Sequence, residues 1–302
     1  IVQGHDYAND DNDAQDDNGH GTFMAGVACA VTDNGVGMAG LSWFGQVLAV
    51  KVLDENGGGF ISDVADGIIF AADNGADVIN LSLGTSDNSL TLENAVKHAF
   101  NKGSLLIAAV GNENAPVIYP AAYDAFVMGV AATDHNDQRA SFSNFGPEVD
   151  IAAPGVSILS TYFNDTYLIA SGTSASAPFV SGLAGLVLSR DPALTPDQIM
   201  QRIKSTSQDV NQGSFPGEDD YLGSGRINAL NALSIAPSGE EVFNATITYT
   251  YDLNGNQITK TILKAKGNPQ AFTYTYDHEN RLIGITSPDG TSSSYTYDGL
   301  GK

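Results

Sequence analysis

Four short and almost uninterrupted apolar segments constrain the fold of this chain more than any other feature. They have the length of strands and lie at residues 46–53, 77–83, 104–110 and 125–132. Segments with the apolar spacing of helices lie between them and end in Gly, as helices often do, at residues 61–75 and 89–103. Apolar strands that alternate with helices are typical of a parallel sheet covered on both faces. The sequence therefore predicts an α/β fold with a mostly parallel sheet flanked by helices.

The composition changes near residues 234–242, and a different pattern follows. The unit Tyr-Thr-Tyr-Asp begins at Tyr249, Tyr274 and Tyr295, with turn residues and alternating apolar positions after the first two copies. This pattern is typical of β-hairpins in a repeat array. It resembles the YD (Rhs-type) repeats of large secreted and surface shells, which implies tethering, display or encasement. We therefore expect three parts, which are a domain at 1–235, a linker at 236–244 and an incomplete all-β repeat segment at 245–302.

The chain is strongly acidic. Its net charge is −22, and residues 1–239 hold 28 acidic and 8 basic side chains. Nucleic acid is an unsuitable partner, because its phosphates require Lys and Arg. No apolar run approaches the length of a membrane span. We expect an extracellular, monomeric protein without a membrane span.

Two segments carry residues suited to nucleophilic catalysis. Ser174 in "SGTSASAP" begins an apolar helix, where unpaired backbone N–H groups and the helix dipole favour a developing oxyanion. The alternative is an ordinary Ser cap before a buried helix. His20 in "NGHGTFMAGV" also begins a helix of small residues. A neutral imidazole there can take a hydroxyl proton near pH 7, although a single His is more often structural.

Asn112 in "LLIAAVGNEN" follows a buried strand and a Gly. Its side chain is therefore expected at the carboxyl end of a strand, where the sites of α/β proteins gather. An amide donor in this place can stabilise a tetrahedral oxyanion. The alternative is an Asn that only stabilises the turn in which it lies.

The motifs "GHGT", "LSLG", "AAVGN" and "GTSASAP", in this order, resemble those of subtilisin-like serine peptidases of the thermitase type. The resemblance covers residues 1–235 and implies a serine endopeptidase. In that reading Ser174 attacks the scissile carbonyl, His20 moves the proton, and Asn112 with the Ser174 backbone N–H holds the oxyanion. It also implies that an extended polypeptide pairs with a cleft and is cut with broad specificity. The implied substrate-binding residues are Ser82, Leu83, Gly84, Gly57, Gly58, Gly59 and Gly111.

The chain departs from the family in two places. The family's catalytic Asp stands in an Asp-[Ser/Thr]-Gly motif well before the His, but only nineteen residues precede His20 and none of their Asp residues has this context. We therefore expect the triad Asp upstream of Ile1 and a truncated chain that is weak or inactive by itself. The second departure is Phe23, which occupies the place of a second, non-catalytic His.

The segment before His20 packs six Asp into twelve residues, and carboxylates at this density suit Ca²⁺. A solvated acidic loop is the alternative. The family resemblance implies calcium ligands at Asp6, Asp11, Asp13 and Gln15. It implies a second calcium loop at Val31, Asn34, Val36 and Met38.

The sequence thus predicts a secreted or cell-surface serine endopeptidase of bacterial type, stabilised by structural Ca²⁺. A rival hypothesis from another class is a non-catalytic surface or binding protein that keeps the peptidase fold as a scaffold.

Overall fold

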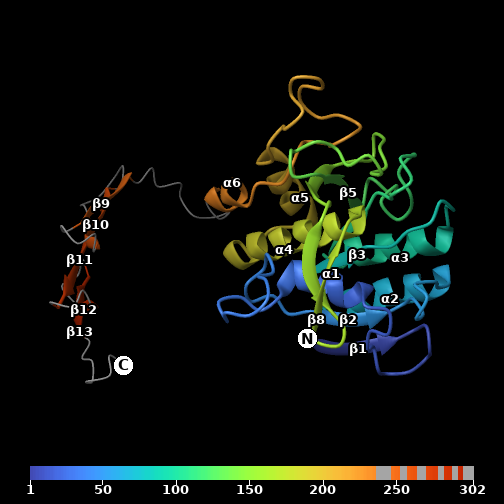
Figure 1. Cartoon of the computed structure of the whole chain (residues 1–302), viewed down its shortest axis with the longest axis horizontal. Helices are drawn as coiled ribbons and strands as arrows, with labels where there is room; N and C mark the ends of the chain where they lie inside the picture. The colour runs from blue at the N-terminus through green and yellow to red at the C-terminus, as the bar shows by residue number, and fades with distance from the viewer. Residues whose placement is uncertain (236–245, 252–256, 264–269, 278–281, 288–291, 295–302) are drawn as a thin grey trace. The chain divides into compact units, whose positions relative to one another are not determined.

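The computed structural model describes residues 1–235, 246–251, 257–263, 270–277, 282–287 and 292–294. Internal contacts divide the chain into two units, Ile1–Ser238 and Gly239–Lys302 (Figure 1). The expected linker at 236–244 falls outside the described residues. None of the helices in the described segments combines the length and the apolar character that crossing a membrane requires.

A four-stranded parallel sheet forms the centre of the first unit, in the order β3-β4-β5-β6. Its strands are β3 (Val78–Leu81), β4 (Leu105–Ala109), β5 (Val127–Thr133) and β6 (Ile151–Pro154). Every residue of β4 and β5 is buried. Such strands read as continuous apolar runs because both faces of the sheet are covered. The predicted α/β fold is confirmed.

The faces of the sheet are covered by two groups of helices, because successive side chains of a strand point to opposite sides. Leu106 and Ala108 pack in the apolar cluster of α2 (Ile61–Asp73) and α3 (Leu90–Asn101). Leu105, Ile107 and Ala109 pack in the cluster of the other face. That face holds α4 (Thr173–Arg190), α5 (Pro196–Ser205) and α6 (Ala229–Ser234).

The N-terminal segment forms a separate small sheet. Strand β1 (Val2–Asp6) pairs in parallel with β2 (Leu48–Lys51), and α1 (His20–Cys29) lies between them in the chain. In the described part of the chain β2 and β3 are each an edge strand, although α2 packs against both. A hairpin of β7 (Ile158–Tyr162) and β8 (Thr166–Ala170) packs through β7 against α1.

The second unit is an antiparallel sheet with the order β13-β12-β11-β10-β9. Its strands are β9 (Thr246–Tyr251), β10 (Gln257–Leu263), β11 (Gln270–Tyr276), β12 (Leu282–Thr286) and β13 (Ser292–Ser294). Tyr249 and Tyr274, which begin the first two repeat units, lie on β9 and β11. The predicted all-β segment is confirmed for these strands, while the third unit at Tyr295 lies outside the described residues.

Candidate active site

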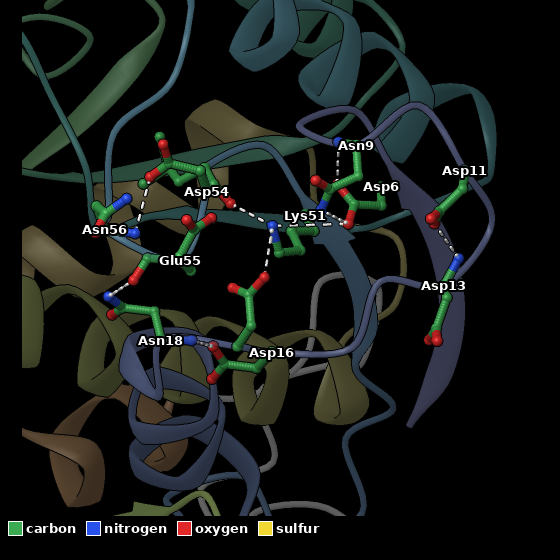
Figure 2. Close-up of polar contacts among 12 residues, drawn as sticks. Asp6, Asn9, Asp11, Asp13, Asp16, Asn18, Lys51, Asp54, Glu55 and Asn56 are labelled. Atoms are coloured by element: carbon green, nitrogen blue, oxygen red, sulfur yellow. Dashed lines mark hydrogen bonds and ion pairs between the residues drawn. The ribbon is translucent and has the colours of Figure 1, made fainter.

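His20 is the first residue of α1, and the loop before it is fixed by Asp16. The Asp16 carboxylate accepts hydrogen bonds from the backbone N–H groups of Asn18 at 3.0 Å, Gly19 at 2.8 Å and Thr22 at 2.7 Å. It also accepts one from the Thr22 hydroxyl at 2.6 Å. Figure 2 shows the bond from Asn18. A carboxylate that binds the free N–H groups of a helix start is an N-terminal cap. These bonds hold the backbone at the start of α1, and with it the position of His20.

The environment of His20 favours its neutral form. One side of the imidazole is exposed, while the protein around the remaining sides removes water from it. This desolvation lowers the pKa of His20 below its usual value, and the Asp16 charge acts in the opposite direction without cancelling the effect. Partial burial acts to raise the pKa of Asp16, but the hydrogen bonds from Thr22, Gly19 and Asn18 outweigh it and hold that pKa low. A neutral imidazole beside an ionised cap is a competent proton acceptor.

Ser174 lies in the first turn of α4, and α4 packs against α1. An apolar cluster between these helices contains Phe23, one turn after His20, and Ala175, which directly follows Ser174. The residues after His20 and after Ser174 therefore pack together, which places the starts of the two helices near each other. Phe23 is almost fully buried in this cluster. Its burial explains why an apolar ring is accommodated where the family resemblance implies a His.

Asn112 and Ser174 provide two hydrogen-bond donors to one small space. The Asn112 Oδ1 accepts bonds from the Thr173 backbone N–H at 2.8 Å and the Thr173 hydroxyl at 3.0 Å, which turns its Nδ2 away. A Cβ placed on Gly172 would lie 3.7 Å from Asn112 Nδ2 and 3.7 Å from Ser174 N. Because Gly172 has no side chain, this space stays open. The same point lies 3.6 Å from Asn112 Oδ1, so the Asn112 amide group and the Ser174 nitrogen both border this space. N–H donors placed around one space in this way are suited to stabilise an oxyanion.

The segment after β3 reaches the same site. Ser82 donates from its hydroxyl to the Ser174 carbonyl at 2.8 Å, and the Ser174 hydroxyl donates to the Ser82 carbonyl at 3.3 Å. Leu83 follows, and Gly84 approaches Tyr119 so closely that a Cβ would lie 2.7 Å from the Tyr119 carbonyl oxygen. The predicted substrate-binding segment at Ser82, Leu83 and Gly84 thus runs directly beside Ser174.

The second predicted wall of the cleft, at Gly57, Gly58 and Gly59, is exposed and tied to the His20 loop. Asn18 donates from its side chain to the Glu55 carbonyl at 2.9 Å (Figure 2). The Asp54 side chain accepts from the Gly58 N–H at 2.9 Å, which closes a tight turn. The glycine segment therefore lies near the loop before His20, and it belongs to a different part of the chain from Ser82. Gly111, the remaining predicted residue, directly precedes Asn112 with a φ of +109°.

Sequence reasoning missed Asp16, Thr173 and Asn144 as functional residues. The Asp-x-x-Gly-His spacing could have identified Asp16 as a cap of the helix that begins with His20. Thr173 and Asn144 act through partners 61 and 31 residues away in the chain, and no local pattern marks such contacts. The described residues provide no hydrogen bond to the His20 ring, and the Asp16 carboxylate is already engaged by its own turn. The described part of the chain therefore holds the three residues predicted as base, nucleophile and oxyanion donor, but among the described residues no carboxylate is bonded to the imidazole.

The acidic residues proposed as calcium ligands share one loop, but most of them engage other partners. The Asp6 carboxylate accepts from the backbone N–H and the side chain of Asn9 and lies 3.6 Å from the Lys51 ammonium. Asp11 accepts from the Asp13 N–H at 2.8 Å, while Gln15 is exposed (Figure 2). The described segments contain no group of three or more His, Cys, Asp or Glu side chains that could hold a metal ion. In this arrangement the loop at Asp6, Asp11, Asp13 and Gln15 does not fit Ca²⁺.

The second loop predicted to bind calcium has a different shape. Residues 31–39 line an open surface pocket of about 200 Å³. The Asn34 side-chain oxygen accepts from the Val36 N–H at 3.0 Å, which bends the loop around this space. Backbone carbonyls and an amide oxygen are the hard donors that Ca²⁺ takes. The predicted residues Val31, Asn34, Val36 and Met38 all line the pocket, so this donor set fits a hard cation.

Comparisons with known proteins agree with this geometry. Residues 1–225 match the model of the subtilase family, and residues 272–302 match the RHS repeat. The chain is 45% identical over 235 residues to the thermophilic serine proteinase of Bacillus sp. (strain AK1), covering 78% of the chain and 57% of that protein. It is 44% identical over 234 residues to thermitase of Thermoactinomyces vulgaris, covering 77% of the chain and 81% of thermitase.

Solved structures give the same result. The structure of sphericase superposes with a TM-score of 0.70 at 31% identity, covering 74% of the chain and 83% of sphericase. A protease of Pseudoalteromonas arctica PAMC 21717 superposes with a TM-score of 0.64 at 37% identity, covering 71% of the chain and 70% of that protein. The family model spans most of the chain, and the residues that it matches include those of the site described above. The chain therefore belongs to the subtilase family of serine proteases and carries an RHS repeat in its second unit.

Proposed function

We propose that this chain carries the catalytic domain of an endopeptidase that cuts extended polypeptides with broad specificity. One observation supports this most directly, namely that the Asn112 amide nitrogen and the Ser174 backbone nitrogen both border the space beside Gly172. A scaffold without activity has no need for two donors at this point. Helix α1 packs against α4, so the helix start with His20 lies near the helix start with Ser174. This packing supports the same function.

The reaction begins with attack of the Ser174 Oγ on the scissile carbonyl carbon, while His20 accepts the hydroxyl proton. The carbonyl oxygen gains negative charge and enters the space between Asn112 Nδ2 and the Ser174 N–H. His20 then gives the proton to the leaving amine, which departs with the C-terminal part of the substrate. Water hydrolyses the acyl-enzyme by the same steps. The lowered pKa of His20 keeps the base unprotonated at neutral pH.

Substrate binding is proposed to rest on main-chain pairing. An extended peptide would lie between the segment Ser82–Gly84 and the glycines at 57–59 and would pair through its main chain with both segments. The glycines lack side chains and allow the peptide backbone to approach closely. Because main-chain hydrogen bonds carry little sequence information, specificity is broad. We expect a preference for large apolar residues before the cut.

The carboxylate that orients His20 is proposed to lie on a further strand between β2 and β3. These strands are edges in the described part of the chain, although Val50 and Ile79 pack in one apolar cluster under α2. Unpaired strand edges inside a parallel α/β sheet are unusual. In well-studied serine proteases, subtilisin included, loss of this carboxylate lowers turnover by about 10⁴. The 302-residue chain alone is therefore expected to be a weak enzyme.

Calcium is proposed as a structural ligand of the 31–38 loop, whose residues line an open pocket. It would link the backbone turns of this loop and take no part in the chemistry. We further propose that the protein is secreted or displayed at the cell surface as a monomer, with the RHS repeats as a tether or casing. The acidic net charge of −22 suits a soluble extracellular protein.

Casein hydrolysis by the full-length protein, which includes the proposed further strand, tests the proposed function. The Ser174→Ala variant should lose hydrolysis entirely, and its melting temperature should change little because Ser174 lies at a partly exposed helix start. Hydrolysis that persists in Ser174→Ala would remove Ser174 from the mechanism. A full-length protein that cuts no polypeptide would instead favour the scaffold hypothesis.

A further inference from the structure

The loop that carries Asn112 is held against another segment of the chain. Its residues 111–116 follow β4, and residues 142–145 lie beside them. The Asn144 N–H donates to the Gly111 carbonyl at 3.0 Å, and the Phe145 N–H donates to the Ala115 carbonyl at 3.0 Å. The Asn114 N–H donates to the Phe142 carbonyl at 2.8 Å, so hydrogen bonds run in both directions between the two segments. The two segments are therefore paired along their length.

The Asn144 side chain lies at the centre of this pairing and is fully buried. Its Oδ1 accepts from the backbone N–H groups of Glu113 at 2.9 Å and Ala115 at 3.0 Å. Its Nδ2 donates to the Pro116 carbonyl at 3.0 Å and to Glu113 Oε2 at 3.1 Å. A side-chain amide has two acceptor and two donor positions, and all four are used here. Fully satisfied buried networks of this kind fix a single backbone conformation.

Two contacts connect this network to the oxyanion hole. Glu113 Oε2 accepts from the Asn112 backbone N–H at 2.8 Å, so the carboxylate that Asn144 holds also holds Asn112. Gly111 has a φ of +109°, and a Cβ there would overlap the Asn144 amide nitrogen. Thr173 holds the Asn112 side chain and accepts from the Gly111 N–H at 3.2 Å. The backbone N–H groups of Asn112, Glu113 and Ala115 are held by the side chains of Glu113 and Asn144.

We propose that Asn144 is a positioning residue of the oxyanion hole, which holds the backbone of residues 111–116 so that Asn112 Nδ2 meets the oxyanion. This inference rests on the proposed peptidase function. Asn144 does not reach the substrate; it acts through Asn112. The oxyanion exists only after attack on the carbonyl, so Asn144 affects the rate of the chemical step and not substrate affinity. Displacements of about 1 Å in such a site can lower rates by about 10².

A double-mutant cycle in the full-length protein separates this role from a merely structural one. The variants Asn144→Ala, Asn112→Ala and the double variant are compared on a chromogenic peptide anilide. Asn144→Ala should lower kcat by about 10- to 100-fold with KM within about twofold. In the Asn112→Ala background the same substitution should cost less than about threefold, because the donor that it positions is gone. An equal loss in both backgrounds, a change confined to KM, or no loss would overturn the positioning role while leaving the function intact.

Two variants guard against general damage to the fold. Ser143→Ala is the matched control, because Ser143 is equally buried in the same segment but its hydroxyl bonds to the Ala132 N–H and the Asn144 carbonyl instead of the loop. It should leave kcat within about twofold of the unsubstituted protein. Asn144→Ser introduces no buried charge beside Glu113 and retains a hydroxyl that can form part of the network, so it serves if Asn144→Ala does not fold. It should show the same dependence on Asn112.

Hydrogen exchange of the 302-residue chain tests the structural half of the proposal without activity. The Glu113 and Ala115 amides should exchange at least about tenfold faster in Asn144→Ala than in Ser143→Ala. Unchanged exchange at these amides would overturn the proposal. If the unsubstituted protein hydrolyses no peptide, the proposed function fails, and the exchange result still decides whether Asn144 holds the loop.

Discussion

Ser174 and Ser82 exchange hydrogen bonds across the site. The Ser174 hydroxyl donates to the Ser82 carbonyl at 3.3 Å, and the Ser82 hydroxyl donates to the Ser174 carbonyl at 2.8 Å. The nucleophile is thus tied to the strand end that we propose to bind substrate. Its own bond is the longer one and uses a carbonyl that a substrate peptide would compete for. Substrate binding is therefore expected to release the Ser174 hydroxyl toward His20.

Removal of the amide donor at position 112 should lower turnover. Asn112→Ala deletes the Nδ2 that faces the space beside Gly172. We expect kcat to fall by about 10² to 10³, as in subtilisin, with KM little changed. Steady-state kinetics on a peptide anilide measure both constants. A kcat that stays within about threefold would exclude Asn112 from the oxyanion hole.

The Thr173 hydroxyl should contribute to the orientation of Asn112. It donates to Asn112 Oδ1 at 3.0 Å and accepts from the Gly111 N–H at 3.2 Å. Thr173→Val keeps the shape of this buried side chain but removes both bonds, so kcat should fall by about tenfold. Thr173→Ser, which retains the hydroxyl, is the matched control and should stay near the unsubstituted rate. Equal rates for the Val and Ser variants would contradict the proposed orientation.

The charge of Asp16 should set the acid limb of the pH profile. Desolvation lowers the pKa of His20, and Asp16 raises it in part. Asp16→Asn removes that opposing charge, so the pKa of His20 should fall further and the acid limb of kcat/KM should move to lower pH. A limb that stays in place or moves to higher pH would show that Asp16 does not act on the base.

Asp16 should also contribute to acid stability. Its pKa is lower in the folded chain than the usual value near 4, so the folded state binds its proton less readily than the unfolded state. Its contribution to stability is therefore present at neutral pH and is lost as the pH falls below about 4 through the lowered pKa. Thermal unfolding of the protein and of Asp16→Asn should differ at pH 7 and converge at low pH. A difference that persists unchanged at low pH would contradict this assignment.

Calcium should stabilise the protein through the 31–38 loop. At a concentration about 100-fold above its Kd, a ligand of the folded state adds about 2.7 kcal/mol, equivalent to several degrees in Tm for a domain of this size. EDTA should remove this increment. Asn34→Ala should abolish the response to calcium, while Asp13→Asn, on the loop that does not fit the ion, should retain it. A Tm that changes with neither calcium nor EDTA would contradict the calcium proposal.

The sequence predicted the parts of this protein that depend on local pattern. The strands β3, β4 and β5 are continuous apolar runs because both faces are covered, and His20, Ser174 and Asn112 stand at element ends that motifs mark. Contacts over long distances in the chain could not be predicted. Asn144 meets Glu113 across 31 residues, and the Lys51 ammonium lies 3.4 Å from Asp17 and 3.6 Å from Asp6. Lys51 supplies this loop with a positive charge, which the prediction of either a calcium loop or a solvated acidic loop did not include.

The structure of the protein after reaction with a fluorophosphonate tests the active site most directly. The reagent bonds covalently to an activated Ser and leaves a phosphoryl oxygen in place of the oxyanion. We predict a bond from Ser174 Oγ to phosphorus, with that oxygen within hydrogen-bond distance of both Asn112 Nδ2 and the Ser174 N–H, beside Gly172. Modification of another residue, or an oxygen that contacts neither donor, would contradict the proposed catalytic site.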